Sequence, residues 1–381
     1  MEILKKFKAV VFAAIALFLY LFGYRHAKET AEKEYLKGEN NDFFNRYYQL
    51  SEVIPLETND SSLMGYIGKI IAAEDYLFIM DGGKTGIWIF DRSGKFVRKI
   101  DKPGRGPGEY VRMGDFMVSR DSQQVIVYDR IGKLNYYDWE GNFLYDRKAG
   151  LYFEQVENLP DGGWITNHGF MHNVKLRDTA YVIIASDADM KPVAGVARYP
   201  NVECAVPIRI TSGLFQDQGC CFVIPLTENT IYEYLPQDTL FVPRYGFKIG
   251  NSVLPDPDHL TDQDILKGFF KDYFLMYGQY IGEKTVWVSL CRLSDSKFNH
   301  LIGDKKTGKV YPLPYKLKDE ENQIFMTRDF QQTGFEGKLV FYATAISITG
   351  MDYKDKNSQG YRLSTQLKDE DNPVLFLYEE K

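Results

Sequence analysis

The feature that most constrains the fold is a stretch of sequence that occurs twice. The first copy covers residues 77–97 and the second covers residues 125–144. In each copy an apolar run ends in an aspartate, a turn follows, and a second apolar run ends in another aspartate ahead of a glycine. The leading aspartates, Asp81 and Asp129, are 48 positions apart. A fixed period of this size, with strands inside each unit, is typical of β-propeller blades.

Diverged copies of the pattern follow along the chain, separated by turn signals. Their apolar runs lie at residues 163–166, 180–185, 221–224, 230–242, 285–290, 299–311, 338–342 and 374–378. We therefore expect an all-β, six-bladed β-propeller over residues 51–381. At about 55 residues per blade, the blades must contain insertions. One is predicted at Asp258–Tyr280, where apolar residues recur at helical spacing. Such a helix would cap one face of the propeller or pack on its outer rim.

A propeller must also join its first and last blades, because two sheet edges otherwise stay exposed. The short β-type run Glu52–Leu56 and the C-terminal run Val374–Tyr378 are the natural partners. We expect them to pair and to complete one shared blade.

The N-terminus has the pattern of an exported protein. Lys5, Lys6 and Lys8 precede an apolar run over residues 9–22. The exit from this run has few small residues, which favours an uncleaved signal anchor over residues 1–25, with a cleaved signal peptide as the alternative. Residues 26–50 are then predicted to be a polar juxtamembrane stalk. This places the bulk of the chain outside the cytoplasm, in the periplasm or at the cell surface, and makes the membrane its first partner.

Composition and charge narrow the classes of partner. Aromatic residues make up 15% of the chain and favour half-buried strands. The net charge is −6, and no basic cluster occurs beyond the N-terminus, so a nucleic-acid partner is not expected. The four cysteines lack metal-ligand spacing. A disulfide between Cys204 and one of the adjacent pair Cys220 and Cys221 is one reading, and buried free thiols are the other.

The most glycine-dense segment, Gly104–Tyr110, joins the two copies of the repeat. It lacks the Gly-Lys-Ser/Thr ending of a phosphate-binding loop and opens no helix. We therefore expect a structural loop between blades, shaped by its glycines and by Pro107. Arg105 and Glu109 are candidate binding residues that would reach into a pocket or pair with each other.

Other candidate site residues lie at strand ends and in the third blade. Asp129 and Arg130 follow the leading strand of the second copy; aspartates at such places usually accept backbone hydrogen bonds within a turn, and calcium ligation is the alternative. His168 and His172 are four positions apart, a spacing that would suit zinc on a helix, but the surrounding pattern indicates a strand. We predict no metal site and no cofactor. No Gly-x-Ser-x-Gly element or Ser/His/Asp set identifies catalytic residues.

Several segments resemble a known family. Phe90–Ile100 followed by Gly104–Tyr110 is similar to the hallmark of six-bladed β-propeller proteins with NHL-like blades in Bacteroidetes-type bacteria. Val53–Thr58, Pro243–Tyr245 and Asn372–Leu375 are similar as well. The resemblance implies a propeller over about residues 52–381 and export from the cytoplasm. It implies no particular activity, and the lipid-accepting cysteine common in that family is missing here.

The sequence therefore favours a membrane-tethered, extracytoplasmic propeller that binds a glycan, a peptide or an envelope protein, since loops at propeller mouths carry function on a rigid scaffold. The alternative hypothesis is a metal-dependent hydrolase or lyase that uses the central channel. A third reading, a purely architectural module, would apply if aromatic side chains plug the channel.

Overall fold

A computed structural model describes most of the chain beyond its N-terminus. The described residues are 42–159, 161–168, 181–198, 214–217, 219–225, 228–247, 274–292, 297–327 and 331–381. The predicted anchor over residues 1–25 and most of the predicted stalk lie outside these ranges. Within them, no helix has the length and apolar character needed to cross a bilayer.

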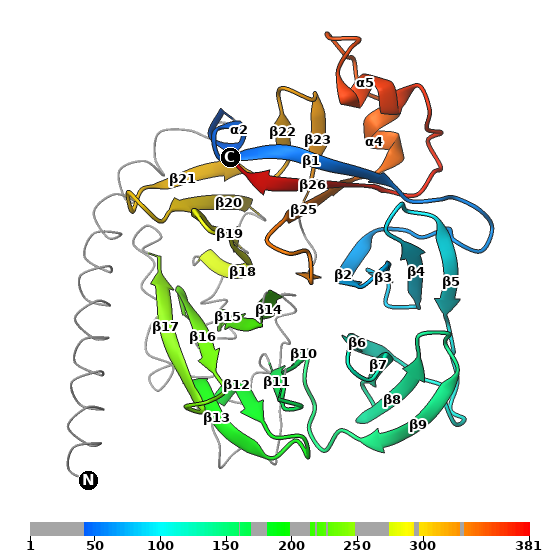
Figure 1. Ribbon diagram of the computed structural model, residues 1–381, viewed down its shortest axis with the longest axis vertical. Helices are drawn as coiled ribbons and strands as arrows, with labels where there is room; N and C mark the ends of the chain where they lie inside the picture. The colour runs from blue at the N-terminus through cyan, green and yellow to red at the C-terminus, as the bar shows by residue number, and fades with distance from the viewer. Residues whose placement is uncertain are drawn as a thin grey trace.

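Six β-sheets stand around a ring, which confirms the predicted six-bladed propeller (Figure 1). Within a blade consecutive strands pair antiparallel, and the first strands of neighbouring blades contact each other around the centre of the ring. The first two blades are β2 (Ile67–Ala73), β3 (Tyr76–Asp81), β4 (Ile87–Asp91) and β5 (Phe96–Ile100), then β6 (Met113–Ser119), β7 (Gln124–Asp129), β8 (Lys133–Asp138) and β9 (Phe143–Lys148). The third and fourth are β10 (Gln155–Asn158), β11 (Trp164–Asn167), β12 (Tyr181–Ser186) and β13 (Pro192–Arg198), then β14 (Leu214–Asp217), β15 (Cys220–Val223), β16 (Thr230–Leu235) and β17 (Leu240–Gly246). The fifth is β18 (Phe274–Ile281), β19 (Thr285–Arg292), β20 (Lys297–Asp304) and β21 (Val310–Pro314).

The middle strands are apolar on both faces because each blade is covered by a neighbour on both sides. In β3, Leu77 and Ile79 pack towards the last blade, whereas Phe78 and Met80 pack towards the second blade. Successive side chains of a strand point to opposite faces, so one continuous apolar run supplies two cores. This is why three of the four short runs in the doubled stretch have no polar interruption, the exception being the buried Asn135.

The ring is closed on its outer side by a strand from the N-terminal part of the chain. The sixth blade consists of β25 (Leu339–Ala343), β26 (Val374–Glu380) and β1 (Tyr48–Pro55). In Figure 1 the blue β1 runs beside the red β26, and Ile54 faces Leu375 in antiparallel register. The predicted pairing of the two chain ends is confirmed.

Asn372 fastens the segment that follows β1. Its side chain accepts the N–H of Met64 at 2.9 Å and donates to the carbonyls of Glu57 at 2.8 Å and Ser62 at 2.9 Å. The turn between β4 and β5 completes the contact: Gly94 has φ +88°, and a Cβ there would lie 2.3 Å from the carbonyl oxygen of Pro55. Three of the segments that carry the family resemblance therefore meet at the closure.

A second closure lies on the inner side. The short β24 (Gln331–Thr333), which precedes β25, leaves the sixth blade and pairs in parallel with β2 of the first blade. It also packs against β14, the first strand of the fourth blade. A segment that leads into the last blade, β24, therefore occupies part of the centre of the ring. The remaining hairpin, β22 (Leu317–Asp319) and β23 (Ile324–Met326), packs on β25.

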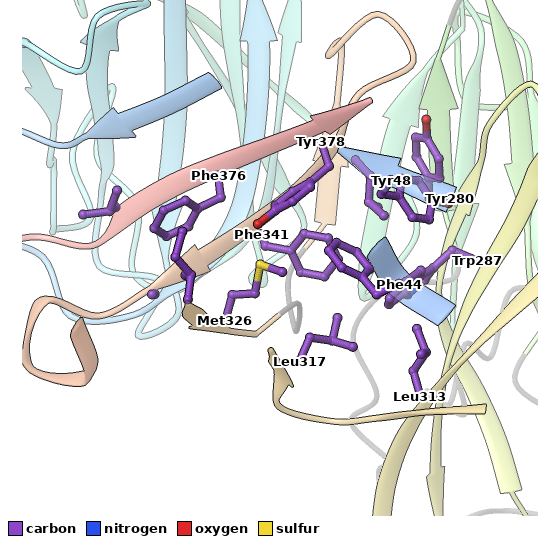
Figure 2. Packing of buried hydrophobic residues seen from close by; sticks show 14 of the residues in the cluster. Phe44, Tyr48, Tyr280, Trp287, Leu313, Leu317, Met326, Phe341, Phe376 and Tyr378 are labelled. Carbon is purple, nitrogen blue, oxygen red and sulfur yellow. The ribbon is translucent and has the colours of Figure 1, made fainter. Parts of the chain in front are cut away.

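The domain begins before the predicted boundary at residue 51. Helix α2 (Asp42–Tyr47) inserts Phe44 between the fifth and sixth blades, where the side chain is fully buried (Figure 2). Its ring lies 4.9 Å from that of Tyr378 and 5.5 Å from that of Phe341. The boundary falls inside β1, so residues 42–50 are part of the propeller and not of a stalk. Their aromatic side chains form the core of the closure.

The predicted helix over Asp258–Tyr280 is wrong at its end. Residues 258–273 lie outside the described part of the chain, whereas residues 274–280 belong to β18. This strand pairs antiparallel with β19, and Tyr280 faces Trp287; the apolar count over the whole segment did not distinguish it from a helix. Short helices occur instead between β25 and β26, as α4 (Ala345–Thr349) and α5 (Gln359–Ser364).

Two of the cysteines are buried free thiols, Cys221 and Cys291. Burial raises the pKa of Cys221 well above its usual range and that of Cys291 to about 11. Cys204, the partner considered for a disulfide, lies outside the described residues.

Candidate functional site

A cavity of about 610 Å³ opens where the chain enters the first strands of the second and third blades. Its walls come from the β3–β4 turn, the loop before β6, the β7–β8 turn and the start of β10. The main polar side chains in its lining are Lys84, Asp101, Tyr110, Arg112, Arg130 and Glu154. The lining carries three cations and two anions, a formal charge of +1 in a chain whose net charge is −6.

The β3–β4 turn presents Lys84 to the cavity. Asp81 shapes this turn by accepting the N–H groups of Gly83 at 3.2 Å and Thr85 at 2.8 Å, as predicted for aspartates at strand ends. The Lys84 ammonium donates to the carbonyl of Gly114. Burial lowers the pKa of Lys84, and this desolvation outweighs the attraction of nearby acidic groups.

Asp129 organises the opposite wall. Its fully buried carboxylate accepts the N–H groups of Val111 at 2.8 Å, Arg112 at 3.1 Å and Ile131 at 3.3 Å. Three backbone donors from two separate loops converge on one side chain, so the β7–β8 turn and the entry to β6 are held together. Asp129 is therefore a positioning residue, and no calcium is needed to explain it.

Arg130 and Glu154 form an ion pair in the cavity wall, with Arg130 Nη1 3.2 Å from Glu154 Oε1. Arg112 is exposed and makes no ion pair with any residue that the structure describes. Among the described residues, the Arg112 guanidinium thus differs from that of Arg130, whose charge is met by Glu154. Lys84 comes from the β3–β4 turn of the neighbouring blade and reaches the carbonyl of Gly114, two residues after Arg112.

His168 lies behind the cavity wall and not in it. Its side chain is fully buried, with Nδ1 2.7 Å from the carbonyl oxygen of Tyr152 and Nε2 2.9 Å from the hydroxyl of Thr166. Burial lowers its pKa to about 4. Both ring nitrogens are bonded within the protein, so His168 is unsuited to ligate a metal. His172 lies outside the described residues.

The glycine-rich loop lines the cavity only with Tyr110, at its end, and otherwise supports the cavity from behind. The Glu109 carboxylate accepts the N–H of Gly106 at 2.8 Å, and Tyr137 donates its hydroxyl to the carbonyl of Gly108 at 2.8 Å. Gly108 has φ +71°, and a Cβ there would lie 2.6 Å from the ring of Phe143. The structural role predicted for this loop is confirmed. Arg105 is exposed, does not pair with Glu109, and neither residue lines the cavity.

Three charged side chains are buried beneath the cavity on the first strands of three successive blades. Lys69 Nζ lies 3.2 Å from Asp115 Oδ1 and 2.9 Å from Glu157 Oε1. Asp115 also accepts the N–H of Val156 at 2.9 Å. Burial raises the pKa of Glu157 against the opposing attraction of Lys69. Gln155 on the same strand lines the cavity above, whereas Glu157 lines a second cavity of about 420 Å³ towards the opposite face.

Sequence reasoning missed most of this arrangement. Of the predicted residues, the structure brings Asp129 and Arg130 to the cavity wall, and a binding role for them stays a prediction. The sequence analysis did not single out Lys84, Arg112 and Glu154. Lys84 lies in a turn between strands, as Arg130 does, and Arg112 and Glu154 come just before the first strands of their blades. The buried ions had a visible signal, because Lys69 interrupts an apolar strand run.

The alternative of a metal-dependent hydrolase or lyase gains no support. Over the residues that the structure describes, no group of three or more His, Cys, Asp or Glu side chains is placed to hold a metal ion. Nothing in the described geometry points to a hydrolase.

Fold and cavity together define an all-β, six-bladed propeller with a charged cavity at one mouth. The model of the family described as a domain of unknown function, DUF4934, matches residues 38–379, and the chain belongs to this family. No curated protein matches the chain. A protein of Bacteroides fragilis NCTC 9343, described as exported, has a similar structure with a TM-score of 0.66 and 20% identity, covering 88% of this chain and 95% of that chain. A duf4221-family member from Bacteroides vulgatus ATCC 8482 has a TM-score of 0.55 and 10% identity, covering 88% of this chain and 99% of that chain.

Proposed function

We propose that this protein is an extracytoplasmic binding module that takes an anionic ligand in the cavity between its first three blades. The observation that carries the proposal is the exposed Arg112 guanidinium, which has no acidic partner among the described residues and borders the cavity of about 610 Å³. A planar guanidinium binds a carboxylate or phosphate with two parallel hydrogen bonds. The candidate ligands are an acidic glycan, an acidic peptide or an envelope protein.

The rest of the lining suits recognition more than chemistry. Arg130 and Glu154 neutralise each other, and the hydroxyl of Tyr110 donates to the carbonyl of Thr85 at 3.0 Å. These groups are held in place and present polar atoms in a partly enclosed space, where charge interactions are stronger than in water. They would fix the orientation of a ligand whose charge is met by Arg112 and Lys84.

The proposed location outside the cytoplasm rests on two observations. The basic and apolar N-terminus has the pattern of an export signal, and a protein of similar fold is described as exported. Tethering through an uncleaved anchor over residues 1–25 is part of the proposal. Fractionation and N-terminal sequencing test it, and a mature soluble protein beginning near residue 28 would overturn the tether.

Calorimetric titration of the full chain tests the ligand class. The probes are oligogalacturonate and hexaglutamate, with maltohexaose as the neutral control. We expect at least one acidic probe to bind, and Arg112→Glu to weaken it by about tenfold or more. Arg105→Glu is the matched control, since Arg105 is exposed nearby but outside the cavity lining, and it should leave binding within about twofold. Failure of both acidic probes, or equal binding by the Arg112 variant, would refute the proposal.

A further inference from the structure

Three apolar side chains stand exposed beside the charged cavity. Val111 is 46% exposed, Ile131 is 56% exposed and Tyr152 is 46% exposed. We call these three residues the apolar collar. Single exposed apolar residues are ordinary on a protein surface, but clustered ones beside a cavity mark a contact site.

The members of the collar lie close together although they come from three segments. The backbone N–H groups of Val111 and Ile131 both bind the Asp129 carboxylate, which fixes these two residues side by side. Gly132, the next residue of the turn, lies against the ring of Tyr152, with 3.8 Å between its ideal Cβ position and Cε1 of that ring. A partner would therefore meet a surface that needs little ordering before binding.

An apolar residue at this place is not shared by the two copies of the repeat, whose turns span residues 82–86 in the first blade and 130–132 in the second. In the first copy of the repeat, the residues that follow Asp81 are Gly82 and Gly83, whereas Arg130 and Ile131 follow Asp129. Both turns pair the same strands of their blades. The exposed Ile131 is thus a property of the second blade and not of the fold.

We infer that the cavity and the apolar collar together bind a peptide segment in which an apolar side chain lies next to a carboxylate. This inference rests on the proposed function and names its ligand class. The carboxylate would bind Arg112, whose N–H is held by the same Asp129 carboxylate that holds the collar. The apolar side chain would pack on Ile131 and Tyr152.

Two observations favour a peptide over other occupants. Val111 and Ile131 are β-branched aliphatic residues, which offer neither a flat ring nor a polar group to the hydroxyls of a sugar, so Tyr152 is the one collar residue with a ring on which a sugar could stack. Three collar residues are also far fewer than the roughly 20–30 residues per side of a standard protein–protein interface. A short segment with one apolar anchor and one charge matches a site of this extent.

A random heptapeptide display library, panned on the full chain, tests the inference. We expect enriched peptides that combine an aromatic or aliphatic residue with a neighbouring Asp or Glu. Synthetic copies should lose about tenfold or more in affinity on Ile131→Asp and on Arg112→Glu, as expected for an anchor and its charge pair. Leu240→Asp is the matched control, because Leu240 is 54% exposed on the fourth blade, and it should leave affinity unchanged.

Each other outcome overturns the inference in a recognisable way. Acidic peptides that bind equally to Ile131→Asp would refute the collar while leaving the anionic cavity intact. Peptides insensitive to Arg112→Glu would refute the proposed function as well. Selective binding of oligogalacturonate, without enrichment of any peptide, would make the ligand a glycan. A dimer in light scattering that dissociates on Ile131→Asp would make the collar a contact between two copies. Unchanged melting temperatures in the variants confirm that each one is folded.

Discussion

Asn372 bonds the end of the chain to the segment that follows β1, and its removal should loosen the whole ring. Asn372→Ala leaves the N–H of Met64 and the carbonyl of Ser62 without their partner, whereas the carbonyl of Glu57 keeps the Ser62 hydroxyl at 2.7 Å. Each buried polar group left unpaired costs about 1–3 kcal/mol. Two such groups cost about 2–6 kcal/mol, and we take a value towards the lower end, about 3 kcal/mol in total.

The corresponding shift in melting temperature follows from the size of the domain. Unfolding entropy of about 2.1 cal/mol/K per residue gives about 0.7 kcal/mol/K for about 330 residues, so about 3 kcal/mol lowers Tm by about 4 °C. Differential scanning calorimetry measures it. The matched control is Asn357→Ala, an exposed position, which should change stability by less than about 0.5 kcal/mol. If Asn372→Ala and Asn357→Ala have the same melting temperature, Asn372 does not hold the ring closed.

Three further predictions concern the buried groups. Phe44→Ala should cost about 3–5 kcal/mol in chemical denaturation, because it empties the fully buried centre of the closure; a loss below about 1 kcal/mol would show that α2 only rests on the ring. Lys69→Met should lower the free energy of unfolding by about 3–5 kcal/mol, because it leaves two buried carboxylates without their cation. Adding Glu157→Gln to Lys69→Met should restore part of this loss. An equal loss in the single and the double variant would contradict an ion pair. Burial lowers the pKa of His168 from 6.5 to about 4, so the unfolded chain binds this proton more readily. Stability should therefore fall as pH drops from about 6.5 to about 4, by up to about 3 kcal/mol for this group, and His168→Gln should remove that part of the pH dependence; identical pH profiles would count against it.

The fold was largely predictable because its rules are local. Short apolar runs separated by glycine-containing turns define the strands, and the recurrence of the same pattern 48 residues later, from Asp81 to Asp129, defines the blades. The pairing of β1 with β26 was predictable for a global reason, since a ring must close. The helix predicted through residues 274–280 failed because apolar spacing alone does not separate a buried strand from a helix.

The candidate site was only partly predictable because its residues are brought together by the ring. Lys84 and Arg112 are nearly thirty positions apart and lie on different blades. Their relation depends on the distance between neighbouring blades, which no local pattern contains. Asp129 was singled out for its place at a strand end, yet its bonds to Val111 and Arg112 depend on the path of the preceding loop. The inner closure by β24 also had no sequence signal, since parallel pairing leaves no turn to detect.

Hydrogen–deuterium exchange of the full chain, with and without saturating hexaglutamate, tests most directly whether this mouth of the propeller is the binding face. The account predicts slower exchange of amides in residues 82–86, 109–113, 130–132 and 154–155, which surround the cavity. Protection confined to residues 119–122 and 333–334, around the cavity at the opposite face, would contradict it, as would unchanged exchange throughout.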